Sequence, residues 1–144
     1  GEPVGDTEPV DLGTVSEGCW VTVTTADASL RVETDRRIRA DPSRFRQLFE
    51  NLFRNAIEHA GPDVTVTVGD VEGGFYVEDD GPGIPAEERG DVFGMGYSTT
   101  DSGTGFGLSI AREVVEAHGW EIAVSDGTDG GARFEITGVA FADE

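Results

Sequence analysis

Asn51 and Asn55, the only asparagines in the 144-residue chain, stand four residues apart. Four residues make about one helical turn, so both side-chain amides lie on the same side of a helix. Seven apolar residues recur around them at the helical period: Phe45, Leu48, Phe49, Leu52, Phe53, Ala56 and Ile57. Both amides lie along the border of this apolar stripe. They either hydrogen-bond water or a neighbouring turn there, or contact a ligand held against the core. Because asparagine is a mediocre helix former, two asparagines inside one helix need an explanation.

A second group of residues that could bind a ligand lies between Asp79 and Pro85, directly after a predicted strand. Gly81 and Gly83 allow positive φ and a close approach of the backbone to a ligand. Asp79, at the end of the strand, is placed where a buried carboxylate can accept a hydrogen bond from an exocyclic amine such as that of adenine. The alternative is a surface turn that happens to be acidic.

The third group is a glycine-rich entry to a helix, made of Gly103, Thr104, Gly105, Phe106, Gly107 and Leu108. A helix N-terminus offers unpaired N–H groups and partial positive charge, which phosphate can reach through such a loop. A phosphate role and a plain helix-entry turn are both open. The loop is not a P-loop, because that motif requires a lysine and the chain has none. It also lacks the glycine spacing of a dinucleotide-binding fingerprint.

Two amphipathic helices position these groups. Asp41-Pro42 predicts the start of the asparagine helix, because aspartate caps helices and proline suits their first turn. Gly61-Pro62 predicts its end near His59. The second helix is predicted from about Thr104 to His118.

Short strands surround the two helices. A short helix is predicted at Asp11–Cys19, and strands at Ser29–Glu33, Arg36–Ala40, Val64–Val68, Phe75–Glu78, Trp120–Ser125 and Ala132–Thr137. Arg36–Ala40 is expected to pair with Ser29–Glu33 as a hairpin, and Glu72-Gly73-Gly74 to turn a second hairpin. Asp79–Gly107 is otherwise a long loop. The pattern predicts an α+β fold, a two-layer sandwich with helices on one face of a mixed, mostly antiparallel sheet.

The length and composition of the chain indicate the number of domains and the cellular compartment. At 15.3 kDa it suits one domain, with residues 1–10 expected as a linker or frayed N-terminus, 11–140 as the domain and 141–144 as a tail. No stretch is long enough to cross a bilayer, and the N-terminus lacks signal-peptide features. The lone Cys19 implies no disulfide. We therefore expect a cytoplasmic domain without membrane contact of its own.

The net charge is −19, and every basic residue is an arginine. Nucleic-acid binding needs a basic footprint, so no nucleic-acid partner is expected. A surface this acidic repels itself at low ionic strength and is tolerated where salt screens it. The charge therefore predicts a halophilic protein from a salt-rich, haloarchaeal cytoplasm. The alternative is a locally acidic domain of an ordinary organism.

The three groups occur in a specific order: N-x-x-x-N on a helix, D-x-G-x-G-I after a strand, a stretch with Phe93, and G-x-G-x-G-L opening a helix. This order resembles the ATP-binding domain of two-component sensor histidine kinases, in the superfamily with gyrase, Hsp90 and MutL. The resemblance covers roughly Asp41 to Thr137. It implies the Bergerat ATP-binding fold, with ATP and Mg²⁺ as cofactors.

The resemblance also implies roles for single residues. Asn55 would ligate Mg²⁺, Asn51 would lie beside the phosphates, and Asp79 would recognise the adenine amino group. Gly81, Gly83 and Ile84 would shape the base pocket, Phe93 would anchor a mobile lid, and Gly103 to Leu108 would cradle the phosphates. His59 is either beside the nucleotide or a partly buried helix histidine.

Two departures from the family pattern bear on mechanism. Relatives that hydrolyse ATP alone carry a glutamate, the general base for water, where this chain has Asn51. Glu50 is next to it but about 100° around the helix. In addition, Glu58 stands where many histidine kinases have a basic residue, and no basic residue occurs from Phe93 to Gly103. Arg54 is a candidate to help neutralise phosphate.

The chain has two histidines, His59 and His118, and neither is a credible phosphoacceptor. We therefore expect a catalytic fragment of a protein histidine kinase. Its partners would be the phosphoacceptor helical-hairpin domain of a homodimeric parent and, downstream, a response regulator in a phosphorelay; the parent itself can be membrane-attached. Two alternatives stay open: a nucleotide-binding sensor without transfer activity, and a serine kinase of the anti-sigma-factor type.

Overall fold

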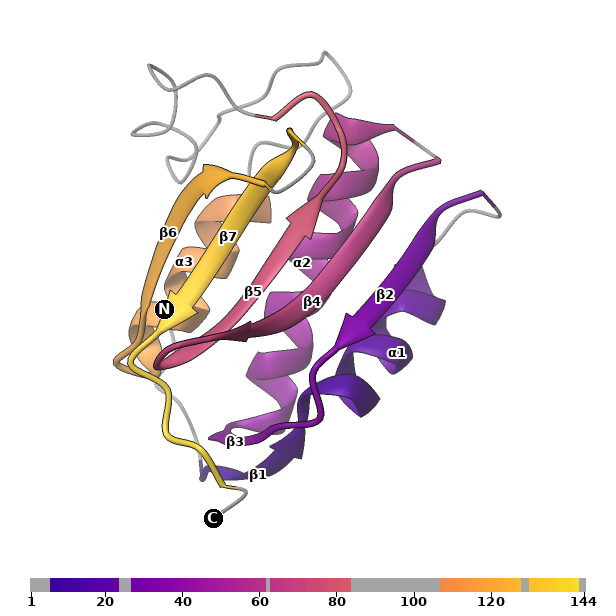
Figure 1. Ribbon diagram of the computed structural model, residues 1–144. Helices are drawn as coiled ribbons and strands as arrows, with labels where there is room; N and C mark the ends of the chain where they lie inside the picture. The colour runs from indigo at the N-terminus through magenta and orange to yellow at the C-terminus, as the bar shows by residue number, and fades with distance from the viewer. Residues whose placement is uncertain (1–5, 24–26, 62, 84–106, 128–129, 143–144) are drawn as a thin grey trace.

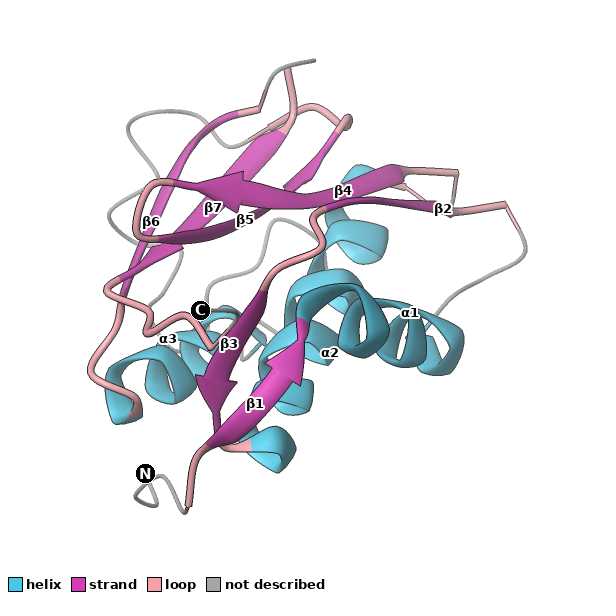
Figure 2. Ribbon diagram, turned by 60° about the horizontal axis from the view of Figure 1, so that its bottom comes forward, coloured by secondary structure: helices cyan, strands magenta, loops and turns pink. Residues whose placement is uncertain are grey.

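The computed structural model describes residues 6–23, 27–61, 63–83, 107–127 and 130–142. Figure 1 shows a sheet with helices behind it, and Figure 2 shows the same two layers from the side. In chain order the elements are β1 (Glu8–Asp11), α1 (Leu12–Val23), β2 (Ser29–Glu33), β3 (Arg37–Ala40), α2 (Pro42–Ala60), β4 (Thr65–Val71), β5 (Gly74–Asp79), α3 (Gly107–Ala117), β6 (Glu121–Asp126) and β7 (Ala132–Thr137).

The main sheet has the strand order β2-β4-β5-β7-β6, and only the β2–β4 pairing is parallel. The expected two-layer α+β fold with a mixed, mostly antiparallel sheet is confirmed. The predicted hairpin between Ser29–Glu33 and Arg36–Ala40 is wrong. Instead β3 pairs antiparallel with β1 in a separate two-stranded sheet, because the connection from β2 to β4 is a parallel crossover that carries the chain through α2.

All three helices cover one face of the main sheet (Figure 2). The core between the layers is aromatic: Phe45, Phe49 and Phe53 follow one another along α2 and are fully buried. The ring of Phe75 from β5 lies 5.6 Å from that of Phe45, edge to face, and Trp120 lies 6.0 Å from it. This packing against the sheet fixes which side of α2 faces inward, and so places Asn51 and Asn55 at its edge.

The ends of α2 follow the predicted signals. Asp41 caps the helix, its Oδ1 accepting N–H bonds from Ser43 at 3.1 Å and Arg44 at 3.4 Å. At the other end Gly61 has φ 110° and donates its N–H to the carbonyl of Ile57. A residue with a side chain is strained at this φ, so the helix stops here.

His118 ties the end of α3 to the start of α2. Its Nε2 accepts the N–H of Asp41 at 3.1 Å, and its Nδ1 lies 2.8 Å from the carbonyl oxygen of Val114. The two helices therefore run in opposite directions. Since the 11 residues of α3 span roughly 16 Å, the N-terminus of α3 lies level with the middle of α2, around Asn51 and Asn55.

The N-terminal part departs from expectation in two ways. Among the described residues, regular structure begins with β1 at Glu8, inside the segment 1–10 that was expected as a linker or frayed N-terminus, because β1 pairs with β3. The helix expected at Asp11–Cys19 extends to Val23. None of the described helices is long and apolar enough to cross a bilayer.

Candidate functional site

Asp79 is the last residue of β5 and is only 9% exposed. Its Oδ1 accepts two backbone N–H bonds, from Gly81 at 2.9 Å and from Ala132 at 3.2 Å. Burial raises the pKa of this carboxyl above its ordinary value; the two N–H bonds lower it, and Asp80 and Glu78 raise it further. The net effect is a raised pKa for an oriented, nearly buried carboxyl group.

Three chain segments meet around Asp79, and glycines make the close approach possible. A Cβ on Gly81 would lie 2.2 Å from the Cβ of Ala60, at the end of α2. A Cβ on Gly131 would lie 1.9 Å from the carbonyl oxygen of Asp79 and 2.4 Å from its Oδ1. Gly83 has φ 80°, a conformation that side-chain-bearing residues rarely adopt. The end of β5, the end of α2 and the start of β7 are thus packed backbone against backbone.

Both asparagines are half-buried on α2. The Nδ2 of Asn51 donates to the carbonyl of Gln47 at 2.7 Å. Asn55 makes no side-chain hydrogen bond to another residue in the described part of the chain. It precedes Ala60 by five residues, roughly 7–8 Å of helix rise, and Ala60 contacts the Asp79 loop through Gly81. The structure therefore brings Asn55 and Asp79 to the same end of α2.

The third predicted group is described only at its end. Gly107 is the first residue of α3, and Leu108 is buried in the core. Ile84, Phe93, Gly103, Thr104, Gly105 and Phe106 lie outside the described residues. Their roles stay predictions. The direction of α3, set by His118, points its N-terminal N–H groups toward the C-terminal end of α2.

The two histidines are both held within the fold. His118 uses both ring nitrogens for hydrogen bonds and stacks on Trp120, with ring centroids 4.1 Å apart. His59 is half-buried near the end of α2 and has an interaction partner of its own. A histidine that accepts a phosphoryl group needs a free ring nitrogen at the surface, so His118 is excluded as a phosphoacceptor.

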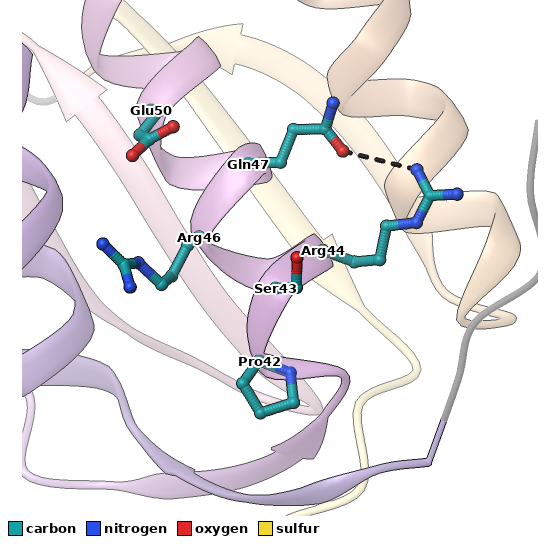
Figure 3. A pocket seen from close by; sticks show the side chains of 6 residues that line it. All are labelled: Pro42, Ser43, Arg44, Arg46, Gln47 and Glu50. Atoms are coloured by element: carbon teal, nitrogen blue, oxygen red, sulfur yellow. Dashed lines mark hydrogen bonds between the residues drawn. The ribbon is translucent and has the colours of Figure 1, made fainter.

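An open groove of about 690 Å³ lies at the other end of α2. Figure 3 shows its lining, in which Arg44 donates to the side chain of Gln47 at 3.3 Å. Glu50 also lines this groove, whereas Asn51 does not. None of the predicted nucleotide-binding residues that the structure describes lines it. The candidate site, with Asn55 and Asp79, lies toward the C-terminal end of α2. The side chain of Glu50 is accordingly directed away from that site.

The described residues would suit a Mg²⁺ ion that takes few of its ligands from the protein. Within the described ranges no three His, Cys, Asp or Glu side chains gather into a metal-binding group. The amide oxygen of Asn55 is a hard ligand in a half-buried position. Mg²⁺ is commonly held by few protein ligands plus phosphates and water.

Three residues of this site were missed from the sequence: Ala60, Gly131 and Ala132. Ala60 supports Gly81, and Gly131 leaves room for the Asp79 carboxyl that Ala132 binds through its N–H. The only sequence signal was the glycine-rich run before β7, which is also typical of any tight turn. A backbone donor carries no side-chain signature at all.

The raised pKa of Asp79 predicts how the stability of the protein depends on pH. A carboxyl whose folded pKa exceeds its unfolded pKa destabilises the fold above the unfolded value, and this penalty disappears as the pH falls below it. Asp79→Asn keeps an oxygen for both N–H donors without the charge. Chemical unfolding in molar KCl should show this variant to be more stable than the parent at pH 7, with a difference that shrinks toward pH 4. A variant less stable at pH 7 would contradict this.

Comparison with known proteins identifies the family. The family model for "Histidine kinase-, DNA gyrase B-, and HSP90-like ATPase" matches residues 40–139. The chain belongs to this ATPase family. The match includes α2, the Asp79 loop, α3 and the start of β7, the segments that form the site.

Sensor histidine kinases are among the relatives of this ATPase domain. It is 38% identical over 109 residues to the sensor histidine kinase ZraS of Salmonella typhi, covering 72% of this chain and 23% of that protein. It is 37% identical to the signal transduction histidine-protein kinase AfsQ2 of Streptomyces coelicolor, covering 81% of this chain and 22% of that protein. The chain thus spans less than a quarter of the length of these two relatives.

Solved structures of histidine kinases share the fold of this ATPase domain. The mycobacterial sensor histidine kinase MprB superposes with a TM-score of 0.78 at 28% identity, covering 93% of this chain and 97% of that one. Full-length ShkA in complex with AMPPNP gives a TM-score of 0.74 at 27% identity, covering 94% of this chain and 32% of that one. The Bergerat ATP-binding fold expected from the sequence is confirmed.

Proposed function

We propose that this domain is the catalytic, ATP-binding part of a sensor histidine kinase. It binds Mg-ATP and transfers the γ-phosphoryl group to a histidine on a separate helical-hairpin domain. The observation that carries the proposal is the arrangement at Asp79, a nearly buried carboxyl oriented by two backbone donors beside the helix end that bears Asn55. An oriented acceptor in a confined site suits recognition of a base amino group.

In this proposal the base and the phosphates occupy different ends of one site. Asp79 accepts the adenine amino group, and Gly81, Gly83 and Ile84 shape the space around the base. Asn51, the N-terminus of α3 and the preceding residues Gly103–Phe106 lie along the phosphates, with Phe93 in the lid. Asn55 would hold Mg²⁺, which would supply charge neutralisation for the phosphates. Leu108 anchors α3 in the core, and His59 lies beside the nucleotide.

The nature of residue 51 favours transfer over hydrolysis. The amide of Asn51 cannot take a proton from water, and Glu50 lines the groove at the other end of α2 (Figure 3). Because residue 51 is an amide and not a general base, we assign the role of nucleophile to an imidazole nitrogen from outside the domain. A P–N bond forms to that nitrogen, the bond from the γ-phosphorus to the bridging oxygen breaks, and ADP leaves. The domain contributes positioning and charge stabilisation.

The partners follow from this chemistry. We assign the phosphoacceptor to the helical-hairpin domain of a homodimeric parent kinase. His118 is fully engaged in the fold, and the proposal places His59 beside the nucleotide. A response regulator receives the phosphoryl group next in a phosphorelay. We place the domain in the cytoplasm, where ATP is available, with any membrane attachment of the parent elsewhere in its chain.

We also propose that the domain is adapted to a salt-rich cytoplasm, on the basis of its net charge of −19. At low ionic strength the carboxylates repel one another across the surface, whereas molar salt reduces the Debye length to about 3 Å. Circular dichroism should show loss of structure when KCl is removed and its return in molar KCl. Full stability at 10 mM salt would contradict this adaptation.

The test of the proposed function is nucleotide binding in molar KCl with and without Mg²⁺. Trp120 is buried against Phe45 near the start of α2, and Trp20 packs on Phe53. Their fluorescence therefore reports unfolding of the core, and the shift of the unfolding temperature measures binding. ATP should stabilise the domain more with Mg²⁺ than without it. A domain that binds no ATP under either condition would overturn the proposal.

A further inference from the structure

The two hydrogen bonds of the Asp79 carboxyl are placed on one oxygen. Both backbone donors, Gly81 and Ala132, bond to Oδ1. Among the described residues, no buried side-chain oxygen or nitrogen lacks a hydrogen-bond partner. Oδ2 has no partner there, so it must retain access to solvent. The carboxyl group is therefore divided into an inner oxygen that binds the protein and an outer oxygen that is open to a ligand.

This division is imposed by backbone, not by side chains that could rotate. The Gly81 N–H is fixed because Gly81 is pressed against Ala60, where a Cβ would lie 2.2 Å from the Ala60 Cβ. The Ala132 N–H is fixed because Gly131 is pressed against Asp79 itself. Any group at position 79 must present an acceptor to both N–H groups, since a buried donor left without an acceptor costs about 1–3 kcal/mol.

We propose that the N–H groups of Gly81 and Ala132 determine the base specificity of the site. They do so by fixing whether the outward-facing atom of residue 79 donates or accepts a hydrogen bond. With both donors on the inner atom, the outer atom of aspartate is an acceptor and selects a purine with a 6-amino group. This inference rests on the proposed function, because it assumes that the base meets Asp79. It adds two backbone groups that determine base specificity: the N–H of Gly81 in the Asp79 loop and the N–H of Ala132 at the start of β7.

We expect the variant Asp79→Asn to change its nucleotide preference. An asparagine could place either its oxygen or its NH₂ outward. If the two N–H groups fix polarity, the amide oxygen must face inward and the NH₂ outward, where it donates instead of accepting. The variant should then reject a 6-amino purine and accept a 6-oxo purine. Were the inner donors unimportant, the amide would turn its oxygen outward and continue to bind ATP.

The test compares binding of ATP and inosine triphosphate, which differ at the 6-position of the base. In molar KCl with Mg²⁺, the parent domain should bind ATP at least about 10-fold more tightly than inosine triphosphate. In Asp79→Asn the order should reverse, so that the ratio of the two affinities changes by about 100-fold or more. An unchanged preference for ATP, or loss of both nucleotides by a folded variant, would overturn the inference.

A second pair of variants tests the donor itself. Ala132→Pro removes the N–H at the first residue of β7, where proline is tolerated, and Ala132→Gly keeps it. In the Asp79→Asn background, the proline should weaken the preference for inosine triphosphate, and the glycine should not. Equal ratios in both would contradict a role for Ala132. A parent domain that binds neither nucleotide would instead overturn the proposed function, on which the inference depends.

Discussion

Replacing Asp79 by alanine should weaken ATP binding by one to two orders of magnitude. The variant loses the charged acceptor for the base amino group, a hydrogen bond worth about 1.5–3 kcal/mol. It also leaves the Gly81 and Ala132 N–H groups without their acceptor, so a lower unfolding temperature is expected as well. Titration of ATP into the folded variant in molar KCl measures the effect.

Asp80→Ala is the matched control for this variant. Asp80 is the neighbouring carboxylate, but it is exposed, and its Oδ1 accepts the N–H of Thr65 at 2.9 Å instead of facing the site. The change removes the same charge one residue away and should leave the affinity for ATP within about twofold. Equal losses in the two variants would mean that acidity of the loop, and not the Asp79 carboxyl, controls binding.

Replacing Asn55 by alanine should remove the dependence of ATP affinity on Mg²⁺. The amide of Asn55 has no hydrogen-bond partner among the described residues, so its loss costs the fold little. In the proposed site it would be the protein's ligand to Mg²⁺. Calorimetric titrations with Mg²⁺ and with EDTA should differ for the parent domain and agree within about twofold for the variant.

Asn51→Ala supplies the control for Asn55, because it removes an amide from the same side of α2 one turn earlier. Its Nδ2 donates to Gln47, and the proposal places it beside the phosphates and not on the ion. This variant should bind ATP more weakly and still respond to Mg²⁺. If Asn55→Ala kept the full response to Mg²⁺, the assignment of the metal ligand would be wrong.

The sequence predicted the helices and strands whose ends are marked by residue types that start or stop them. The asparagine helix was placed within one residue of its observed end, because Asp41-Pro42 and Gly61 act through local backbone geometry. The strand Ala132–Thr137 was predicted at its observed bounds. By contrast, the pairing of β3 with β1 depends on contacts between distant segments. A short alternating strand such as Arg37–Ala40 carries no information about its partner.

The sequence indicated candidate site residues where side chains act and not where the backbone acts. Asp79 and Asn55 were predicted because a carboxyl after a strand and an amide within a helix are unusual placements. The N–H of Ala132 and the close packing of Gly131 against Asp79 were not, because they depend on how the start of β7 meets the end of β5 in three dimensions. The same glycine and alanine in a turn that did not pack against Asp79 would not orient its carboxyl group.

The most direct test of the central claim is phosphoryl transfer. The domain is mixed with the helical hairpin of its parent kinase and ATP labelled at the γ-position, in molar KCl with Mg²⁺. We expect labelled hairpin whose phosphate is lost in acid, as is typical of phosphohistidine. Tight ATP binding without any labelled hairpin would contradict the account and indicate a nucleotide sensor. Acid-stable phosphate on a partner protein would also contradict it and indicate a serine kinase.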